Sequence, residues 1–127
     1  MVFISGIEKA PISLGEVENI LKVLGKLVTL HGLKEPIIEY LVIVNYREIV
    51  SHCSKKEYIA IDDKACISNG LIILCGDVLS NVFIEELMRA YYALGMWETY
   101  TSINLESLDR FVRENLLDVL FSLKKNL

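Results

Sequence analysis

Apolar residues near the start of the chain recur with the period of a helix. Ser13 and Glu16 form the pattern of a capping box, which predicts that this helix begins there. Gly32 is expected to end it, and Gly25 predicts close packing because glycine costs about 1 kcal/mol relative to alanine inside a helix. The stripe that this helix would bury consists of Val17, Ile20, Leu21, Leu24, Leu27, Val28 and His31.

The middle of the chain carries shorter apolar runs that predict strands. VFIS near the N-terminus is expected to form a short strand or an extended arm. IIEYLVIVNY, 37–46, is β-branched, aromatic and mostly apolar on both faces, which predicts a central strand covered on two sides. REIVSHCSKK is interpreted as a loop or a short strand, and EYIAIDD, 57–63, as a second strand.

Asn69-Gly70 lies between two apolar runs and predicts a two-residue hairpin turn, because both central residues of that turn need positive φ. The turn would place Ser68 opposite Leu71 and Cys66 opposite Ile73. Cys75 would then lie diagonal to Cys66, and diagonal Cα atoms are about 7–8 Å apart. That distance is long for a disulfide, so the sequence leaves open whether these two cysteines bond.

A further helix is predicted over 81–94. Ser80 or Asn81 is expected to cap its start, and Gly95 to end it. The residues that follow are interpreted as a turn holding Trp97, the only tryptophan.

The last predicted helix, 104–123, begins after Asn104 and is apolar on several sides. Its main stripe is Leu105, Leu108, Val112, Leu116, Val119, Leu120 and Leu123. Phe111, Leu117 and Phe121 lie off that stripe, and a single core contact does not easily cover a helix of this kind.

The order of these elements predicts an α/β or α+β fold: a small mixed β-sheet with a hairpin, helices packed on it, and a long C-terminal helix. The 127 residues suit a single domain over 1–127. A hydrophobic content of 53% and a mean hydropathy of +0.41 indicate a large core or a buried interface.

Charge and targeting signals narrow the class of protein. Uncharged stretches such as ACISNGLIILCG fall short of the roughly 20 residues that a membrane span needs, and the N-terminus lacks the pattern of a signal peptide. We therefore expect a soluble cytoplasmic protein with no membrane partner. The net charge is −4 and no basic stripe is visible, which disfavours nucleic acid as a partner. The absence of glutamine is a weak thermophile tendency, and intracellular disulfides are less unexpected in such organisms.

The cysteines and histidines do not form a recognised motif. Three cysteines at loose spacing without C-x-x-C favour buried, apolar side chains. His52-Cys53 resembles one half of a zinc site. A structural site needs about four ligands, and only His31, Cys66 and Cys75 could provide the others. We instead expect His31 to act at the C-terminal end of the first helix, where the helix dipole favours positive charge.

The segment FIEELMRAYYALG, 83–95, has the spacing of a metal-binding helix. It resembles the active-site helix of the zincin metallopeptidases, whose H-E-x-x-H motif provides two zinc-binding histidines and a glutamate general base. The order of elements is similar as well, with a helix, strands and a hairpin, then LIILCGDVLSN leading into this helix. The resemblance implies a zincin-like fold in which Glu86 keeps the position of the base.

This chain departs from the zincin motif at both ligand positions. Glu85 and Arg89 stand where the histidines would be, and arginine stays protonated and cannot bind zinc. The resemblance therefore implies an inactive domain in which an ion pair replaces the metal. Glu85 and Arg89 are also spaced as i and i+4, the favoured order for an ordinary helical ion pair, so the alternative interpretation is a simple amphipathic helix with an exposed ion pair.

The sequence favours binding over catalysis, with no cofactor and no metal. We predict a homo-oligomer, most simply a dimer through the helix at 104–123, with another protein as the alternative partner. The predicted interface consists of Tyr92, Trp97, Phe111, Leu117 and Phe121, because aromatic and large apolar residues are typical of interfaces. The alternative hypothesis is a divergent metal-dependent hydrolase that uses Asp62, Asp63, Asp77 and Glu86.

Overall fold

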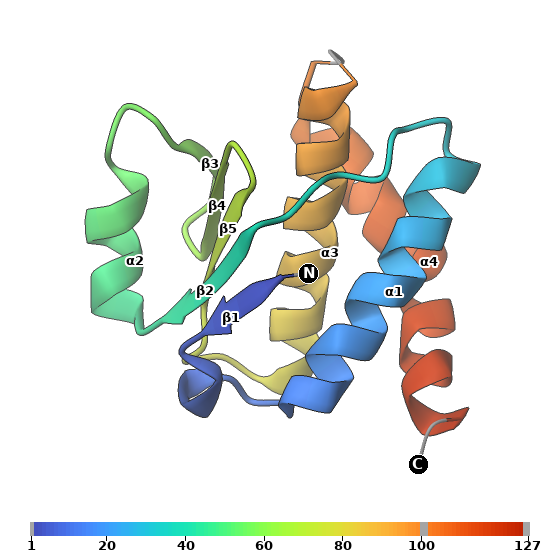
Figure 1. The fold of residues 1–127 in the computed structure, drawn as a ribbon, viewed down its shortest axis with the longest axis horizontal. Helices are drawn as coiled ribbons and strands as arrows, with labels where there is room; N and C mark the ends of the chain where they lie inside the picture. Colours follow the sequence, from blue (N-terminus) through green and yellow to red (C-terminus); the bar gives the residue numbers. More distant parts are fainter. Residues whose placement is uncertain (1, 100–101, 126–127) are drawn as a thin grey trace.

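The computed structural model describes residues 2–99 and 102–125. Five strands form one mixed sheet in the order β1-β2-β5-β4-β3 (Figure 1). They are β1 (Phe3–Ser5), β2 (Tyr40–Val44), β3 (Ile59–Asp62), β4 (Ala65–Ser68) and β5 (Leu71–Cys75). β1, β2 and β5 run parallel, and β4 and β3 continue the sheet as antiparallel strands. The predicted strand at 37–46 is confirmed as β2, which lies between β1 and β5 but covers only Tyr40–Val44.

Helices cover both faces of this sheet. The helical segments are η1 (Ile7–Lys9, a 3-10 turn), α1 (Leu14–Leu30), α2 (Tyr46–Cys53), α3 (Ser80–Glu98) and α4 (Leu105–Lys125). α3 lies along one face with α1 and α4 packed against it, and α2 covers β4 and β5 on the other face (Figure 1). The architecture is an α+β fold with a mixed sheet, a hairpin and a long C-terminal helix, as predicted. None of the helices in the described residues is both long and apolar enough to cross a membrane.

Two apolar clusters hold these layers together. The larger lies between the sheet and the three helices α1, α3 and α4, and includes Leu41, Ile72 and Phe83. The smaller lies under α2 and is built around Ile49 and Ile73. β2 and β5 contribute side chains to both clusters. These two strands therefore bury apolar surface on both faces of the sheet, which stabilises the fold by about 25 cal/mol per Å².

Several local predictions are confirmed in α1 and α4. Glu16 N donates to Ser13 Oγ at 3.2 Å and Ser13 N donates to Glu16 Oε1 at 3.0 Å, which completes the capping box. Gly25 is buried, and a Cβ there would meet the Glu35 carboxylate and the Tyr91 hydroxyl. At the start of α4, Ser107 N donates to Asn104 Oδ1 at 2.8 Å.

The hairpin has the predicted register. Ser68 pairs with Leu71 and Cys66 with Ile73, as expected. Gly70 has φ 70°, a backbone angle that residues other than glycine rarely adopt.

The prediction of a loop or short strand for REIVSHCSKK is wrong, because residues 46–53 form α2. Asn45 caps this helix, with Glu48 N donating to Asn45 Oδ1 at 2.9 Å. Only Ile49 of α2 is fully buried, so its apolar stripe is too narrow to show as a helical period.

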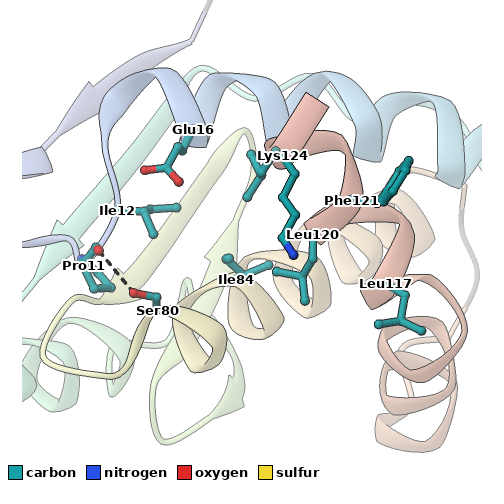
Figure 2. Close-up of a pocket in the computed structure, with 10 residues that line it drawn as sticks. Pro11, Ile12, Glu16, Ser80, Ile84, Leu117, Leu120, Phe121 and Lys124 are labelled. Carbon is teal, nitrogen blue, oxygen red and sulfur yellow. Dashed lines mark hydrogen bonds between the residues drawn. The ribbon is translucent and has the colours of Figure 1, made fainter. Parts of the chain in front are cut away.

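The predicted limits of α3 are also wrong. The helix begins after Leu79 with no side-chain cap, and the Ser80 hydroxyl instead donates to the Pro11 carbonyl at 3.3 Å (Figure 2). Gly95 does not end α3, which continues to Glu98. A Cβ at Gly95 would be in ordinary van der Waals contact with the Lys34 carbonyl oxygen, at 3.4 Å, in the connection between α1 and β2. Of the turn predicted after it, residues 96–98 are helical, and residues 100–101 lie outside the described residues.

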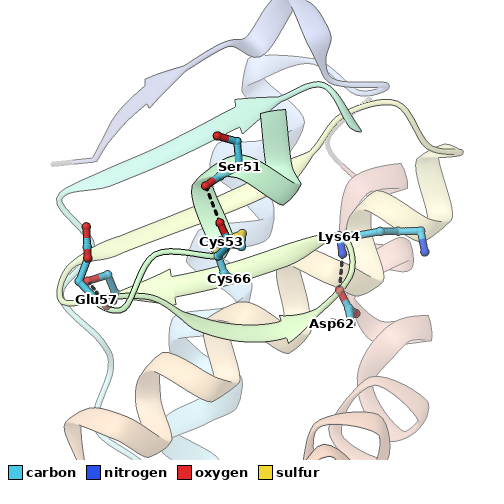
Figure 3. Close-up of a disulfide and its surroundings, with 8 residues drawn as sticks. Ser51, Cys53, Glu57, Asp62, Lys64 and Cys66 are labelled. Atoms are coloured by element: carbon cyan, nitrogen blue, oxygen red, sulfur yellow. Dashed lines mark hydrogen bonds between the residues drawn. A yellow bond between two sulfur atoms is a disulfide. The ribbon is translucent and has the colours of Figure 1, made fainter. Parts of the chain in front are cut away.

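Cys53 and Cys66 form a disulfide that ties the end of α2 to β4 (Figure 3). The prediction that all three cysteines are simple apolar side chains is therefore wrong for this pair, and Cys75 is a free, buried thiol. The hairpin register places only Cys75 near Cys66, so the sequence offered Cys75 as the candidate partner. The correct partner, Cys53, could not be identified because it lies at the end of α2, a helix that was not predicted.

Replacing Cys53 with serine should lower the free energy of unfolding by about 3 kcal/mol, since a bond that closes a short loop mainly restricts the unfolded chain. Urea denaturation with and without a phosphine reductant checks this. The reductant should lower the midpoint of the wild type and of a Cys75→Ala control, and leave Cys53→Ser unchanged. A wild-type midpoint that does not respond to reductant would contradict the bond.

Candidate functional site

The residues of the zincin-like segment lie where α3 passes β3 and α4. Glu86 is only 6% exposed, and Glu85 and Arg89 are half-buried. A carboxylate and a guanidinium at this depth lose much of their hydration, so each needs a partner. The contacts that they make define the first candidate site.

Arg89 bridges α3 and α4. Its Nη1 donates to Glu86 Oε1 at 3.1 Å, and its Nε donates to Asp109 Oδ1 at 2.9 Å. The predicted Glu85–Arg89 ion pair is wrong: it does not occur among the ion pairs of the described residues. The reason is that α4 places the Asp109 carboxylate beside the guanidinium, where it accepts from Nε. The more deeply buried Glu86 accepts from Nη1.

Glu86 is held as a neutral acid. Burial raises the pKa of its carboxyl to about 8, a hydrogen bond with Asp62 and the negative charge of Asp62 act in the same direction, and Arg89 and Lys64 oppose them. Among the described residues, Glu86 Oε2 is a buried oxygen with no donor. A proton on Oε2 resolves this, because the oxygen then donates to the Asp62 carboxylate on edge strand β3.

The four acids of the alternative hydrolase hypothesis are not gathered in one place. Only Asp62 and Glu86 interact, while Asp63 pairs with Lys64 Nζ at 3.0 Å and Asp77 accepts from Tyr46 N at 2.9 Å. In residues 2–99 and 102–125, no three His, Cys, Asp or Glu side chains are arranged to hold a metal ion.

The predicted zinc half-site at His52-Cys53 is excluded by the disulfide, because the Cys53 sulfur is bonded to Cys66 and is not a thiolate. His31 acts at the end of α1 as predicted, with Nδ1 against the Leu27 carbonyl oxygen at 2.9 Å.

Three of the predicted interface residues take part in the packing of the helices. Phe111 is 2% exposed, and the Tyr92 ring stacks on it with centroids 4.3 Å apart. The ring of His31 meets Phe111 edge-on at 5.3 Å, which joins α1 to α4. Trp97 is half-buried and packs against the larger core cluster. Phe111 therefore does not need the external cover that the sequence suggested.

The other two predicted interface residues do face outward. Leu117 is 79% exposed and Phe121 is 60% exposed, and both lie on the second half of α4. We call these two side chains the α4 ridge.

A groove of about 680 Å³ lies beside the α4 ridge (Figure 2). Its walls come from the segment before α1, the start of α3 and the end of α4. The lining residues are Pro11, Ile12, Glu16, Ser80, Ile84, Leu117, Leu120, Phe121, Leu123 and Lys124. Sequence reasoning found only the α4 wall, because no local pattern shows that Ile12 and Ile84, which are distant in the chain, lie opposite it.

Comparison with protein-family models, curated proteins and solved structures found no match to this chain. The function is therefore inferred from the two sites themselves.

The neutral Glu86 predicts that stability falls as pH rises from about 4.5 to about 8. The unfolded chain releases this proton near pH 4.3, whereas the folded protein keeps it up to a pKa of about 8. Within that window the folded state binds more protons, so the free energy of unfolding decreases with pH, by at most about 1.4 kcal/mol per unit from this group.

Glu86→Gln tests this directly, because glutamine keeps an acceptor for Arg89 and a donor for Asp62 without titrating. Urea denaturation across the same pH window should show that this component of the slope is lost, and Glu85→Gln, one residue away, should retain it. Equal slopes in wild type and Glu86→Gln would show that Glu86 is already ionised in the folded protein.

Proposed function

We propose that this protein is a non-enzymatic interaction protein that associates with itself, most simply as a dimer, through α4. The observation that carries the proposal is the α4 ridge beside a largely apolar groove. Leu117 at 79% exposure and Phe121 at 60% are large side chains whose placement in water is unfavourable. Burial of each would stabilise a complex by roughly 1.5–3 kcal/mol, and exposed apolar patches of this kind mark interaction sites.

Leu117→Glu should convert the dimer to a monomer at micromolar concentration, since it would place a carboxylate in an apolar interface. Light scattering coupled to size exclusion measures the mass, against 14.4 kDa for one chain. Leu105→Glu is the matched control, because Leu105 is 60% exposed at the other end of the same helix. It should leave the mass unchanged.

A wild-type protein that runs as a clean monomer under these conditions would overturn the proposal of self-association. If Leu117→Glu and Leu105→Glu both reduced the measured mass from dimer to monomer, dimerisation would depend on the surface charge of α4 and not on the α4 ridge.

We also propose that α3 is an inactive counterpart of a zincin helix. Support comes from the position of Arg89, which stands at a ligand position of the motif and is held by carboxylates from α3 and α4. A permanent positive charge there opposes a catalytic cation. The metal-dependent hydrolase has less support, because Asp62 and Asp63 both accept hydrogen bonds from Lys64, whereas Asp77 accepts from Tyr46 N on a different segment.

Restoring the two histidines tests this second proposal. Glu85→His combined with Arg89→His recreates H-E-x-x-H beside Asp109, which would provide a third ligand. The double variant should bind Zn²⁺ at least roughly tenfold more tightly than the wild type, as measured by competition with a chromogenic chelator.

The matched control is Glu106→His with Arg110→His, which replaces an exposed ion pair of the same i,i+4 spacing on α4. Two histidines on any helix bind zinc weakly, so equal affinity in the two double variants would remove the support for a zincin-like site.

The proposed location is the cytoplasm, with no nucleic acid, membrane or cofactor as partner. The Cys53–Cys66 disulfide is compatible with this in a thermophilic organism, where intracellular disulfides are common.

A further inference from the structure

The groove beside the α4 ridge carries opposite charges on its two walls. Glu16 lies at the start of α1 near Ile12, Lys124 extends from the last turns of α4 toward Leu120, and Ile84 lines the same groove (Figure 2). Within the described residues these two groups do not form an ion pair with each other.

Glu16 retains the capacity to bind a partner. Its Oε1 accepts the capping hydrogen bond from Ser13 N at 3.0 Å. A carboxylate has about four acceptor positions, so this bond leaves it able to receive an ammonium group. The Lys124 side chain is exposed and carries three donors on a flexible stem.

The same surface therefore contains both the α4 ridge and the groove, and it carries both an acidic side chain, Glu16, and a basic one, Lys124. A surface that contains both halves of a contact is suited to a two-fold interface, in which residue i of one copy meets residue j of the other and the reverse. A partner with a single-sign charge would satisfy only one wall.

We infer that the occupant of the groove is α4 of a second copy, with the Leu117 and Phe121 side chains of each copy in the groove of the other and reciprocal Glu16–Lys124 pairs across the two-fold axis. This inference rests on the proposed self-association and adds its partner surface and its geometry. The apolar contacts supply most of the affinity, and the two charge pairs select the orientation.

Paired charge reversals test the reciprocal contact. In a Glu16→Lys dimer both inter-chain pairs become Lys–Lys, and in a Lys124→Glu dimer both become Glu–Glu. Each variant alone should dimerise roughly tenfold or more weakly than the wild type, because like charges then face each other twice. When the two variants are mixed, every pair is again Lys–Glu, and the heterodimer should recover close to wild-type affinity.

Native mass spectrometry of the mixture, with one variant labelled with ¹⁵N, separates the heterodimer from both homodimers. Each variant mixed with its own labelled copy is the matched control and should remain mainly monomeric. Glu16→Lys also loses its capping contact with Ser13, twice in its homodimer, once in the heterodimer and not at all in the Lys124→Glu homodimer. A heterodimer that is stronger than the Lys124→Glu homodimer therefore reports the charge pairing and not the cap.

The outcomes distinguish this inference from the function on which it rests. A monomeric wild type overturns self-association itself. A dimeric wild type whose two variants dimerise equally well overturns the Glu16–Lys124 contact and leaves self-association intact. Two weakened variants that fail to combine overturn the reciprocal arrangement.

Discussion

The contact between α3 and α4 combines buried apolar side chains with the guanidinium of Arg89, which links the two helices. The hydrogen bond from Arg89 Nε to Asp109 requires that Asp109 face α3. Leu108, Phe111, Val112 and Val119 are buried on one side of α4, and Leu117 lies on the opposite side. The orientation of the α4 ridge therefore follows from this burial, and the Arg89–Asp109 contact is an additional polar link between α3 and α4.

The same guanidinium lies beside the buried Glu86. Burial and the neighbouring Asp62 raise the pKa of Glu86 to about 8, and the charge of Arg89 opposes this rise. Burial of a separate carboxylate charge would cost more than the attraction to one half-exposed cation returns. The segment with the spacing of a metal-binding helix therefore contains a polar network that links β3, α3 and α4.

The sequence predicts the fold wherever its signals are local and the candidate sites only in part. Ser13 with Glu16, Asn69 with Gly70, and Asn104 each mark an element correctly, because capping and turn geometry depend on neighbouring residues. The misses depend on tertiary contacts. Gly95 lies inside α3 and is buried there, and Cys53 bonds Cys66 because α2 folds onto the far face of the sheet.

The candidate sites also divide into residues that local signals identify and residues that only tertiary contacts reveal. Leu117 and Phe121 were identifiable because the helical period leaves them off the main stripe, and Glu86 and Arg89 because of their spacing. Asp109 and the Ile12 wall of the groove were not identifiable, since nothing local in the sequence shows which segments meet the ends of α3 and α4.

The most direct test of the Arg89 bridge is hydrogen exchange at its side chain, measured by NMR on the wild-type protein. If Nε–H is bonded to Asp109 as described, its exchange with water should be at least roughly tenfold slower than that of Arg113, which is exposed on α4. Asp109→Ala, which removes the acceptor, should abolish most of this protection. Exchange at Arg89 as fast as at Arg113 would contradict the bridge between α3 and α4.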